Sequence, residues 1–347
     1  MTHPSYTLPD LGWSAQFQSQ LSLADFETLR PARIAAVHRS RLEGLSADGP
    51  VDLTLPPDLP AGDTAVGDWV LYAPDTGRMS RVLDRTSLLK RRAAGTGAVD
   101  QLIAANVDTL LIVTSANADF NPARLERYLA LAHAAGAQPL IVVTKSDLCA
   151  DPDLVQDALR KVARTVPHVA LDARDPAAAG ALADWCGKGQ TLACVGSSGV
   201  GKSTLVGTLT GQALATQGIR EDDAKGRHTT TSRALYRLPA GGWLIDTPGM
   251  RALRLTGVED GIDQVFDDIA DLAAQCRFGD CTHETEPGCA VQAAIADGNL
   301  SPDRLARWQK LRREDRHNSE TIAQARARGR AFGKMVRQVT REKKDRR

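Results

Sequence analysis

Residues 196–203 read Gly-Ser-Ser-Gly-Val-Gly-Lys-Ser, the pattern of a phosphate-binding loop. The uncharged, β-prone run 191–195 precedes them and the predicted helix 204–209 follows, so the strand–loop–helix context that this pattern needs is present. Glycine lets the backbone approach a diphosphate closely, so that successive N–H groups can point at phosphate oxygens beside a helix N-terminus. Lys202 is expected to reach the outer phosphates, and the Ser203 hydroxyl is expected to bind Mg²⁺. The residues predicted to bind phosphate are Gly196, Ser197, Ser198, Gly199, Val200, Gly201, Lys202, Ser203 and Thr204.

The motif Asp-Thr-Pro-Gly occupies residues 246–249, directly after the apolar run 243–245. An aspartate at a strand end can hold Mg²⁺ through water, and the N–H group of Gly249 can contact a terminal phosphate. A simple turn would have the same composition, but its position downstream of a phosphate loop favours phosphate sensing. Asp246 is therefore predicted to bind Mg²⁺ together with Ser203.

The segment between these two motifs, residues 217–233, is polar and has no apolar periodicity, so we expect a loop that orders around a ligand. It contains the run Gly-Arg-His-Thr-Thr-Thr at residues 226–231. A threonine hydroxyl is expected to complete the magnesium ligands. We assign this role to Thr230, with its two threonine neighbours as open alternatives.

A base-recognition motif is predicted after the buried strand 139–143, at Thr144, Lys145, Ser146 and Asp147. In an open parallel sheet, ligands bind beyond the carboxyl ends of the strands. The Asp147 carboxylate can accept hydrogen bonds from the ring N–H and the exocyclic amine of guanine, whereas adenine lacks this pair of donors. The stem of Lys145 can lie along the base. Alone, a Lys-x-Asp sequence at a strand end is common, but with the phosphate loop it predicts the base-reading half of one site.

Three cysteines and one histidine within 14 residues have the spacing of metal ligands: Cys276, Cys281, His283 and Cys289. Four such ligands complete the tetrahedron of a structural zinc site, and the glycine and proline residues between them permit the turns. Because no coordination position stays open, we predict one structural zinc ion per chain. The other cysteines have no comparable spacing and are predicted to be core or surface thiols: Cys149, Cys186 and Cys194.

The elements that must position these residues follow from apolar periodicity. Nearly continuous apolar runs at 107–114 and 139–143 predict buried parallel strands, and the spacing of residues 124–135 predicts a helix between them. This alternation predicts a doubly wound α/β sheet. Short β-like runs between residues 33 and 92 predict a five-stranded barrel of the oligonucleotide-binding (OB) type. Its candidate exposed aromatics are few (Trp69 and Tyr72), so an RNA-binding barrel and a protein-docking barrel both remain open.

The predicted organisation is therefore multidomain α/β. Residues 1–32 are expected to be a poorly structured arm with a short amphipathic piece, and basic helices are expected at about 302–316 and 319–340. The predicted parts are an N-terminal arm with an OB-type barrel (1–94), a nucleotide-binding domain (95–257) and a zinc-binding, basic helical domain (258–347).

Composition supports a cytoplasmic globular protein of 347 residues, with 42% hydrophobic and 24% charged residues. No basic segment followed by an apolar stretch suggests a secretory signal, and no apolar run approaches the roughly 18 residues of a membrane helix. Residues 301–347 carry 16 Lys/Arg against 6 Asp/Glu, while the preceding residues carry 27 against 36. A basic tail on an acidic body suggests a nucleic-acid partner, although a solvated charged helix would have the same composition. The cations expected to contact phosphates are Arg312, Arg313, Arg316, Arg326, Arg328, Arg330 and Lys334.

The order of the motifs is permuted relative to ordinary GTPases, in which the phosphate loop comes first. Here the base motif precedes the phosphate loop, the threonine-rich run and Asp-Thr-Pro-Gly. With the run at 226–231 and the Cys/His set, this order resembles the ribosome small-subunit-dependent GTPase A (RsgA) family over nearly the whole chain. The resemblance implies a circularly permuted GTPase that binds the small ribosomal subunit and its rRNA and acts late in the assembly of that subunit. We expect a monomer that uses GTP and Mg²⁺, has no membrane partner and is stimulated by the subunit.

The sequence departs from common GTPase patterns at three points. Thr144 stands where Asn is commoner, which should weaken contacts to guanine and between loops. Asp172 stands where a Ser or Thr would precede the alanine that touches the guanine carbonyl. Met250 stands where a glutamine would orient water, so the hydrolytic residue must lie elsewhere. We predict that His228 is this catalytic residue, and the family resemblance points to the same position.

Two other functions would use the same phosphate loop. A nucleotide-switched, ribosome-binding factor with negligible turnover is favoured by Met250. A P-loop kinase or ATPase of small molecules is disfavoured by Asp147 and by the lack of a domain for an acceptor substrate. Phosphate release over many turnovers would distinguish a GTPase from the binding factor. Competition between ATP and GTP for the site would distinguish it from the kinase or ATPase.

Overall fold

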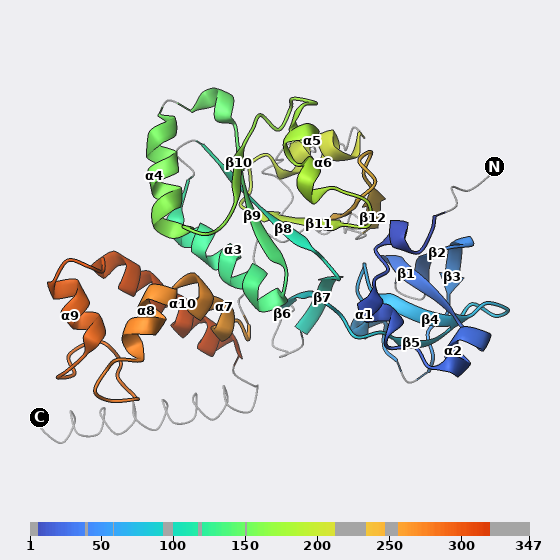
Figure 1. Ribbon diagram of the computed structural model, residues 1–347, viewed down its shortest axis with the longest axis horizontal. Coiled ribbons are helices and arrows are strands. Elements are labelled where there is room, and N and C mark those ends of the chain that lie inside the picture. The colour runs from blue at the N-terminus through green and yellow to red at the C-terminus, as the bar shows by residue number, and fades with distance from the viewer. Residues whose placement is uncertain are drawn as a thin grey trace, which may run out of the picture.

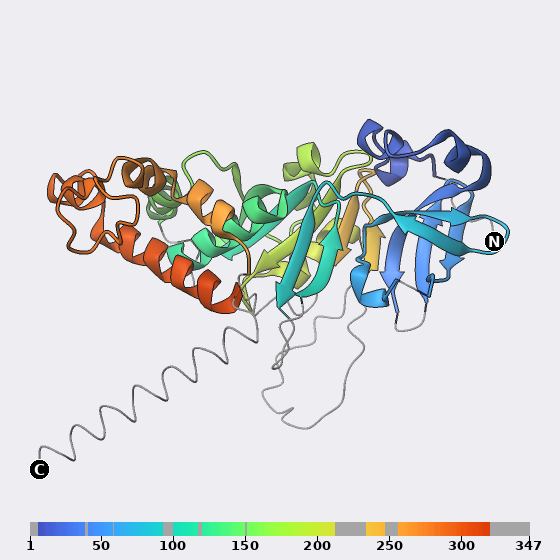
Figure 2. The ribbon, with the colours of Figure 1, turned by 90° about the horizontal axis from the view of Figure 1, so that it is seen from below.

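The computed structural model describes residues 6–38, 41–57, 59–92, 100–116, 120–149, 151–211, 234–246 and 256–319. The strands are β1 (Arg30–Val37), β2 (Leu42–Ser46), β3 (Gly49–Leu53), β4 (Trp69–Ala73), β5 (Arg78–Val82), β6 (Leu88–Arg92), β7 (Asp100–Ala105), β8 (Thr109–Ser115), β9 (Gln138–Thr144), β10 (His168–Ala170), β11 (Thr191–Gly196), β12 (Ala234–Arg237) and β13 (Trp243–Asp246). The α-helices are α1 (Ala15–Gln18), α2 (Leu23–Thr28), α3 (Pro122–Ala135), α4 (Pro152–Val162), α5 (Ala178–Ala181), α6 (Lys202–Thr210), α7 (Glu259–Val265), α8 (Asp267–Ala273), α9 (Ala290–Ala296) and α10 (Pro302–Ser319). The 3₁₀ helices are η1 (Pro9–Leu11), η2 (Ala61–Asp63), η3 (Ser146–Leu148) and η4 (Ala183–Trp185). Figures 1 and 2 show the N-terminal strands at one end of the molecule, the α/β part in the middle and helices α7–α10 at the other end.

The middle part is a sheet in which β10, β9, β8, β11 and β13 are adjacent and parallel in that order. Its strands are apolar throughout because helices cover both faces. Leu110 and Ile112 of β8 face a core that includes α3 and α4, whereas Leu111 and Val113 face a second core that includes α6. The predicted doubly wound sheet and its two central strands are confirmed.

Helix α3 connects β8 to β9 and covers one face of the sheet (Figure 1). It begins at Pro122 because the side chain of Asn121 accepts a hydrogen bond from the N–H group of Arg124 at 3.1 Å, and proline fits the first helical position. It ends at Gly136, which adopts a left-handed conformation with φ of 75°. The predicted helix at 124–135 is therefore confirmed, with one additional half-turn at its start.

The N-terminal strands pair antiparallel in the order β3, β2, β1, β4 and β5. The two edges of this sheet meet at Thr54, whose N–H group donates to the Gly77 carbonyl and whose carbonyl accepts from the Met79 N–H group, both at 3.0 Å. The pairing of β3 with β5 is limited to this point among the described residues, so a continuously closed barrel is not present. Ala36 of β1 also pairs with Ala234 of β12, which joins these strands to the central sheet.

The aromatic residues considered as an exposed face of these strands lie in the interior. Trp69 is 0% exposed and Tyr72 is 4% exposed, so the expectation that they are the exposed aromatics is wrong, and neither ring is available for base stacking. Tyr72 packs in the core between the N-terminal strands, and Trp69 packs against the N-terminal arm. The short strands place large side chains inward because they have little other apolar surface to bury.

The N-terminal arm is folded onto the rest of the protein, so the prediction of a poorly structured arm is wrong for residues 6–28. Leu11 and Phe17 are buried, and the ring of Trp13 meets that of Trp69 edge-on with centroids 4.8 Å apart. The indole N–H group of Trp243 donates to the Asp10 carbonyl at 2.7 Å. A residue from the central sheet, more than two hundred positions away, thus holds the arm.

The C-terminal helices pack on α3. Gly261 of α7 allows a close approach, since a Cβ atom there would lie 2.1 Å from the Ala130 carbonyl oxygen. Glu126 of α3 is fully buried and accepts hydrogen bonds from Arg307 at 2.8 Å and Arg304 at 3.4 Å, both on α10. Burial raises the pKa of Glu126, and the two guanidinium groups oppose this shift. These contacts attach the C-terminal helices to α3 and so to the central sheet.

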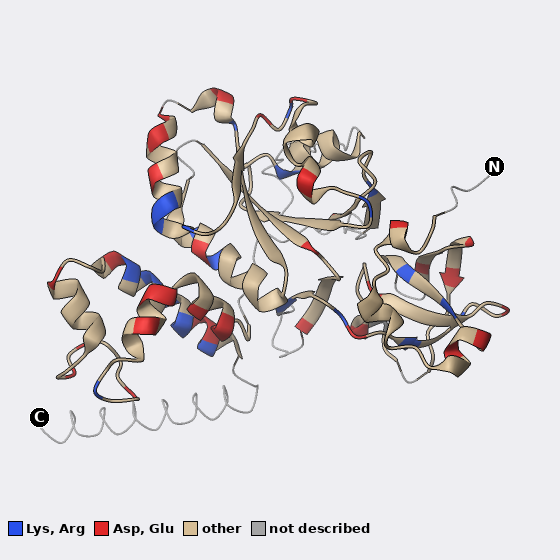
Figure 3. Ribbon diagram, viewed as in Figure 1, with Lys and Arg blue, Asp and Glu red and all other residues tan. Residues whose placement is uncertain are grey.

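The helix predicted at 302–316 is α10, and the one predicted at 319–340 lies outside the described residues except for its first position. Figure 3 shows charges of both signs on α10 and the helices beside it. Arg312, predicted to contact RNA phosphates, forms ion pairs with Asp263 and Glu259 of α7. The contact of Arg312 with RNA phosphates therefore stays a prediction, and it would compete with these two ion pairs. Within the described residues, every helix falls short of the length and apolar character needed to cross a membrane.

Candidate nucleotide-binding and metal-binding sites

The phosphate loop connects the end of β11 to the start of α6, as its pattern predicts. Gly196 has φ of 147°, and a Cβ atom there would lie 2.2 Å from the Val113 carbonyl oxygen. Gly201 has φ of 91° and immediately precedes α6. Both glycines of the pattern are therefore required by the backbone itself, independently of any ligand. The loop places the N-terminus of α6, the end of a helix that favours anions, at the carboxyl edge of the sheet.

Lys202 is the first residue of α6, and its side chain turns back over the loop. Its ammonium group donates to the Gly196 carbonyl at 2.7 Å and also to the Ser197 carbonyl. This geometry centres a positive charge on the loop that is predicted to bind phosphate. The adjacent Ser203 is exposed on the first turn of the helix.

Asp246 ends β13, the parallel neighbour of β11 (Ala193 pairs with Ile245). Its negative charge contributes, after burial, to the raised pKa of Tyr236. The neighbouring strand ends bring Asp246 to the same edge of the sheet as the loop that carries Ser203. A carboxylate and a hydroxyl are hard oxygen donors of the kind that Mg²⁺ prefers, so these two residues fit the predicted ion.

The base motif and the phosphate loop meet, which is the central expectation from the permuted order. Thr144 ends β9 and is fully buried. Its hydroxyl lies within hydrogen-bonding distance of two carbonyl oxygens, that of Val200 in the phosphate loop at 2.5 Å and that of Thr114 in β8 at 3.0 Å. A hydroxyl has one proton and can donate to only one of them at a time. Thr144 therefore links the base motif to the phosphate loop through one hydroxyl donor. This link was expected to be weaker than the one an Asn side chain would make.

Replacing Thr144 by Val should weaken nucleotide binding while leaving the fold intact. Valine has the same shape but no donor, so the Val200 carbonyl would lose its link to β9 and the phosphate loop would become less ordered. We expect the dissociation constant for GDP to rise about 10-fold, the size of one hydrogen bond. Calorimetric titration measures this constant. Thr210→Val on α6 is a matched control because its hydroxyl bonds only within the helix; equal GDP affinities for both variants would contradict the prediction.

Asp147 follows in η3 and points toward the loop after β10. Its Oδ2 atom accepts a hydrogen bond from Nη2 of Arg174 at 2.7 Å. Arg174 also forms a two-pronged contact with Asp172, through Nε and Nη2 at 2.9–3.2 Å. The guanidinium group lowers the pKa of Asp172, so this carboxyl is ionised at neutral pH. Sequence reasoning identified two of these residues and missed Arg174, whose position depends on how two loops meet.

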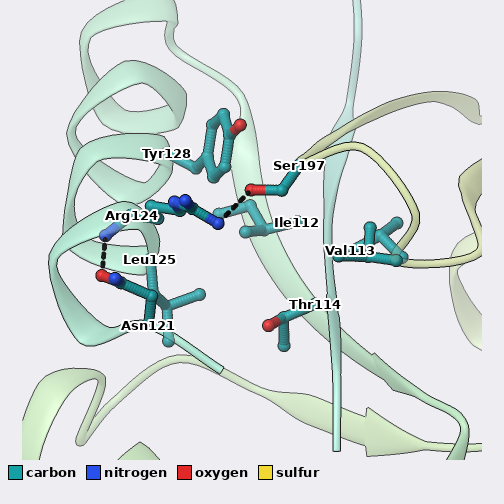
Figure 4. Close-up of a pocket in the computed structure, with 9 residues that line it drawn as sticks. Ile112, Val113, Thr114, Asn121, Arg124, Leu125, Tyr128 and Ser197 are labelled. Carbon is teal, nitrogen blue, oxygen red and sulfur yellow. Dashed lines mark hydrogen bonds between the residues drawn. The ribbon is translucent and has the colours of Figure 1, made fainter. Parts of the chain in front are cut away.

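Arg124 is a second cation beside the loop that sequence reasoning missed. Figure 4 shows its side chain, on the first turn of α3, directed at Ser197, and the two side chains are 3.4 Å apart at Nη1 and Oγ. Tyr128, Leu125 and Ile112 form the apolar wall of the same small cavity. The Asn-Pro pair that starts α3 marks the helix N-terminus in the sequence, but nothing local indicates that this terminus lies against the phosphate loop.

The four predicted metal ligands form one cluster, in which the ligand atoms all lie within 4.8 Å of one another: Cys276, Cys281, His283 and Cys289. The Sγ atoms of Cys276 and Cys289 are 3.9 Å apart, and each is 3.6 Å from Nδ1 of His283. In a tetrahedral zinc site with Zn–S distances of about 2.3 Å, sulfur atoms lie about 3.8 Å apart. The donor set and its spacing therefore fit zinc. The thiols Cys186 and Cys194 are buried in the core, and burial raises the pKa of Cys186 to about 11.

Several predicted site residues lie outside the described residues: His228, Thr230, Gly249 and Met250. The remaining predicted nucleotide ligands lie at the carboxyl ends of β9, β11 and β13, on the turns that follow them or in the first turn of α6. The predicted convergence of base motif, phosphate loop and Asp246 at one edge of the sheet therefore agrees with the strand order.

Comparison with known proteins identifies a family that this chain resembles. A family model described as RsgA GTPase matches residues 82–256. The chain is 55% identical over 323 residues to "Small ribosomal subunit biogenesis GTPase RsgA" of Mesorhizobium japonicum, covering 92% of this chain and 93% of that protein. It is 49% identical over 343 residues to "Small ribosomal subunit biogenesis GTPase RsgA 2" of Vibrio parahaemolyticus, covering 99% and 95%.

Solved structures agree. YjeQ from Thermotoga maritima superposes with a TM-score of 0.62 at 25% identity, covering 82% of this chain and 97% of that one. YloQ, described as a circularly permuted GTPase, superposes with a TM-score of 0.60 at 24% identity, covering 84% and 96%, and this likeness concerns the fold alone. Motif order, strand order and full-length similarity lead to one conclusion: the chain belongs to the RsgA family of circularly permuted GTPases.

Proposed function

We propose that this protein hydrolyses GTP, with Mg²⁺, during late assembly of the small ribosomal subunit, and that the subunit stimulates the reaction. The single observation that carries the proposal is the hydrogen bond from Thr144 to the Val200 carbonyl, because it joins a guanine-reading motif to a phosphate loop. The printed names of the full-length relatives support the role in small-subunit biogenesis.

The described residues divide the work of binding. Asp147 accepts hydrogen bonds from guanine, and Lys145 lies along the base. The N–H groups of the loop and the ammonium group of Lys202 hold the phosphates and stabilise charge that develops on them during hydrolysis. Ser203 and Asp246 hold Mg²⁺, which neutralises phosphate charge when bound.

Phosphate release from GTP, measured over many turnovers with and without purified small subunits, tests the proposal. Slow release alone and a large stimulation by the subunit are expected, because the chain has Met250 where a water-orienting glutamine would stand. Binding without turnover in both conditions would replace this proposal with a nucleotide-switched binding factor. Asp147→Asn should shift the binding preference of the protein from GTP toward xanthosine triphosphate. Such a shift would confirm that this carboxylate recognises the base.

His228→Ala should slow hydrolysis while leaving GTP bound. We propose that the imidazole hydrogen-bonds a water molecule near the terminal phosphate, and such positioned groups contribute about 100-fold or more to rates. Turnover with small subunits should fall by about that factor, while the GTP dissociation constant changes less than about threefold. His168→Ala is a control because His168 is an exposed histidine paired with Gln156. Unchanged turnover in the His228 variant would remove this residue from the reaction.

The finer features of the other two parts are also proposed. One structural zinc ion would occupy the Cys₃His cluster, supported by its sulfur and nitrogen spacing. The N-terminal strands would form an OB-type barrel, supported by their order and by the contact of Thr54 with β5. We further propose that the protein works as a cytoplasmic monomer that contacts rRNA, since residues 301–347 carry 16 Lys/Arg against 6 Asp/Glu.

A further inference from the structure

Arg174 lies beside the carboxylate that is proposed to read guanine, and this arrangement extends the base-recognition site. Its side chain is 68% exposed, and its Nη2 atom is 2.7 Å from Asp147 Oδ2. We infer that Arg174 is a specificity-determining residue that donates hydrogen bonds to the O6/N7 edge of guanine while Asp147 accepts from the adjacent N1–H group and 2-amino group. This inference rests on the proposed function, because it assumes that Asp147 binds the base.

Asp172 fixes the guanidinium group in place. The contact uses the Nε and Nη2 groups, so that Arg174 is held by a fork rather than by a single bond. Asp172 also accepts from the Arg174 backbone N–H group at 2.9 Å, which closes a tight turn. Both protons of Nη2 are used, one on each aspartate. Among the described residues, the two protons of Nη1 have no hydrogen-bond partner, so they are available to a ligand.

The acceptor of Asp147 and the donors of Arg174 lie side by side in the order that complements the hydrogen-bonding groups of guanine but not those of adenine. Guanine presents the N1–H and amine donors next to the O6 acceptor, and arginine is the side chain that most often recognises its O6 and N7 atoms. A carboxylate next to a guanidinium group is the complement of that pattern. Adenine reverses it, with an amine donor at position 6 next to an unprotonated N1, so both protein groups would face the wrong partner.

The same arrangement explains the unusual Asp172. An ionised carboxylate close to the guanine O6 atom would repel it. Because Asp172 is paired with Arg174, it presents the guanidinium group to the base and keeps its own charge on the far side. Asp172 is therefore a positioning residue, and the Asp-Ala-Arg sequence at 172–174 acts as a unit.

Titrations with three diphosphates test the inference: GDP, 6-thio-GDP, whose sulfur is a poor acceptor at position 6, and IDP, which lacks the amine at position 2. The full-length protein and its Arg174→Ala variant are compared. Loss of a charge-assisted hydrogen bond in an exposed site should raise the GDP dissociation constant about 5- to 20-fold. The native protein should prefer GDP over 6-thio-GDP, and this preference should fall to about one in the variant, while the preference for GDP over IDP is retained.

Matched variants separate the possible outcomes. Asp172→Asn should reduce the preference for GDP over 6-thio-GDP less than Arg174→Ala does. It weakens the two-pronged contact that holds the guanidinium group but leaves the donor itself in place. Arg160→Ala, which breaks an exposed ion pair with Asp157 on α4, should change neither preference. The inference would be overturned if Arg174→Ala kept the preference for GDP over 6-thio-GDP and lost part of the preference for GDP over IDP. That result would show that Arg174 only holds Asp147 in place. A native protein that binds ADP as well as GDP would instead overturn the proposed function.

Discussion

Replacing Cys289 by Ala should release the metal and unfold the C-terminal cluster. The Cys289 side chain contacts both Cys276 and His283, and it also accepts a hydrogen bond from the Gln292 N–H group at 3.4 Å as the N-cap of α9. One substitution thus removes a ligand and a helix cap. Structural zinc contributes about 10–16 kcal/mol to the folding of isolated zinc-finger peptides, so three ligands are not expected to hold the segment.

The packing around the cluster sets how far this unfolding spreads. His283 is buried, its ring lies 5.5 Å from that of Trp308 on α10, and its carbonyl accepts from the Gln292 side chain at 2.6 Å. Val291 and Leu305 belong to the same continuous core as α3. Loss of metal should therefore loosen α9 and part of α10, while the phosphate loop, which is anchored by β11 and α6, keeps its structure.

Zinc content by atomic absorption, thermal unfolding and GDP titration check this prediction. The native protein should carry one zinc ion per chain and the variant none, with a lower first unfolding transition and GDP affinity within about threefold of native. Cys149→Ser is the matched control, since Cys149 is a partly exposed cysteine outside the cluster. Stoichiometric zinc in Cys289→Ala would show that the ligand set is wrong.

Local motifs were predictable from the sequence because their geometry is local. The phosphate loop needs only a strand, two glycines at fixed positions and a helix, and Gly196 and Gly201 are both positions where the backbone requires glycine. The four zinc ligands lie within one short segment. The meeting of Thr144 with Val200 was predictable for a different reason, since the carboxyl ends of parallel strands share one edge of the sheet.

Features that depend on distant segments were not predictable. The arm looks unstructured by itself because its partners, Trp69 and Trp243, belong to two other parts of the chain. Strand β2 has little β propensity and forms because β1 and β3 supply partners on both sides. Arg174 and Arg124 enter the site only through the way in which loops and helix termini meet. Exposure of Trp69 was wrongly expected because strand alternation does not say which face is covered.

Arg33→Met should destabilise the junction between the N-terminal strands and the nucleotide domain by about 2–4 kcal/mol, since it removes a buried donor from several acceptors. Arg33 is 1% exposed. Its guanidinium group donates to the Leu11 carbonyl at 2.7 Å, the Asn106 carbonyl at 3.2 Å and the Thr191 hydroxyl at 2.7 Å. Burial lowers the pKa of Arg33 to about 10, so the group remains charged at neutral pH.

The magnitude depends on two opposing effects. Methionine fills a similar volume and removes a charge that is costly to bury, which stabilises the variant. The carbonyls of Leu11 and Asn106 would however lose a donor in a dry interior, and each such loss costs about 1–3 kcal/mol. Destabilisation should dominate because these hydrogen bonds meet at one buried point that joins the N-terminal arm, the residue after β7 and the start of β11. Denaturant unfolding measures the change, and Arg78→Met, at an exposed arginine of β5, is the control. A loss below about 0.5 kcal/mol would contradict the prediction.

The position of this junction gives the prediction a functional consequence. Thr191 begins β11, the strand that ends in the phosphate loop, and Arg33 lies on β1, which belongs to the N-terminal strands. The bond between them fixes the orientation of those strands relative to the nucleotide. If both parts must contact the small subunit at once, Arg33→Met should leave GDP affinity near native and lower subunit-stimulated turnover. Full stimulation in a variant with a measurably loosened junction would show that the subunit does not require the two parts in a fixed orientation.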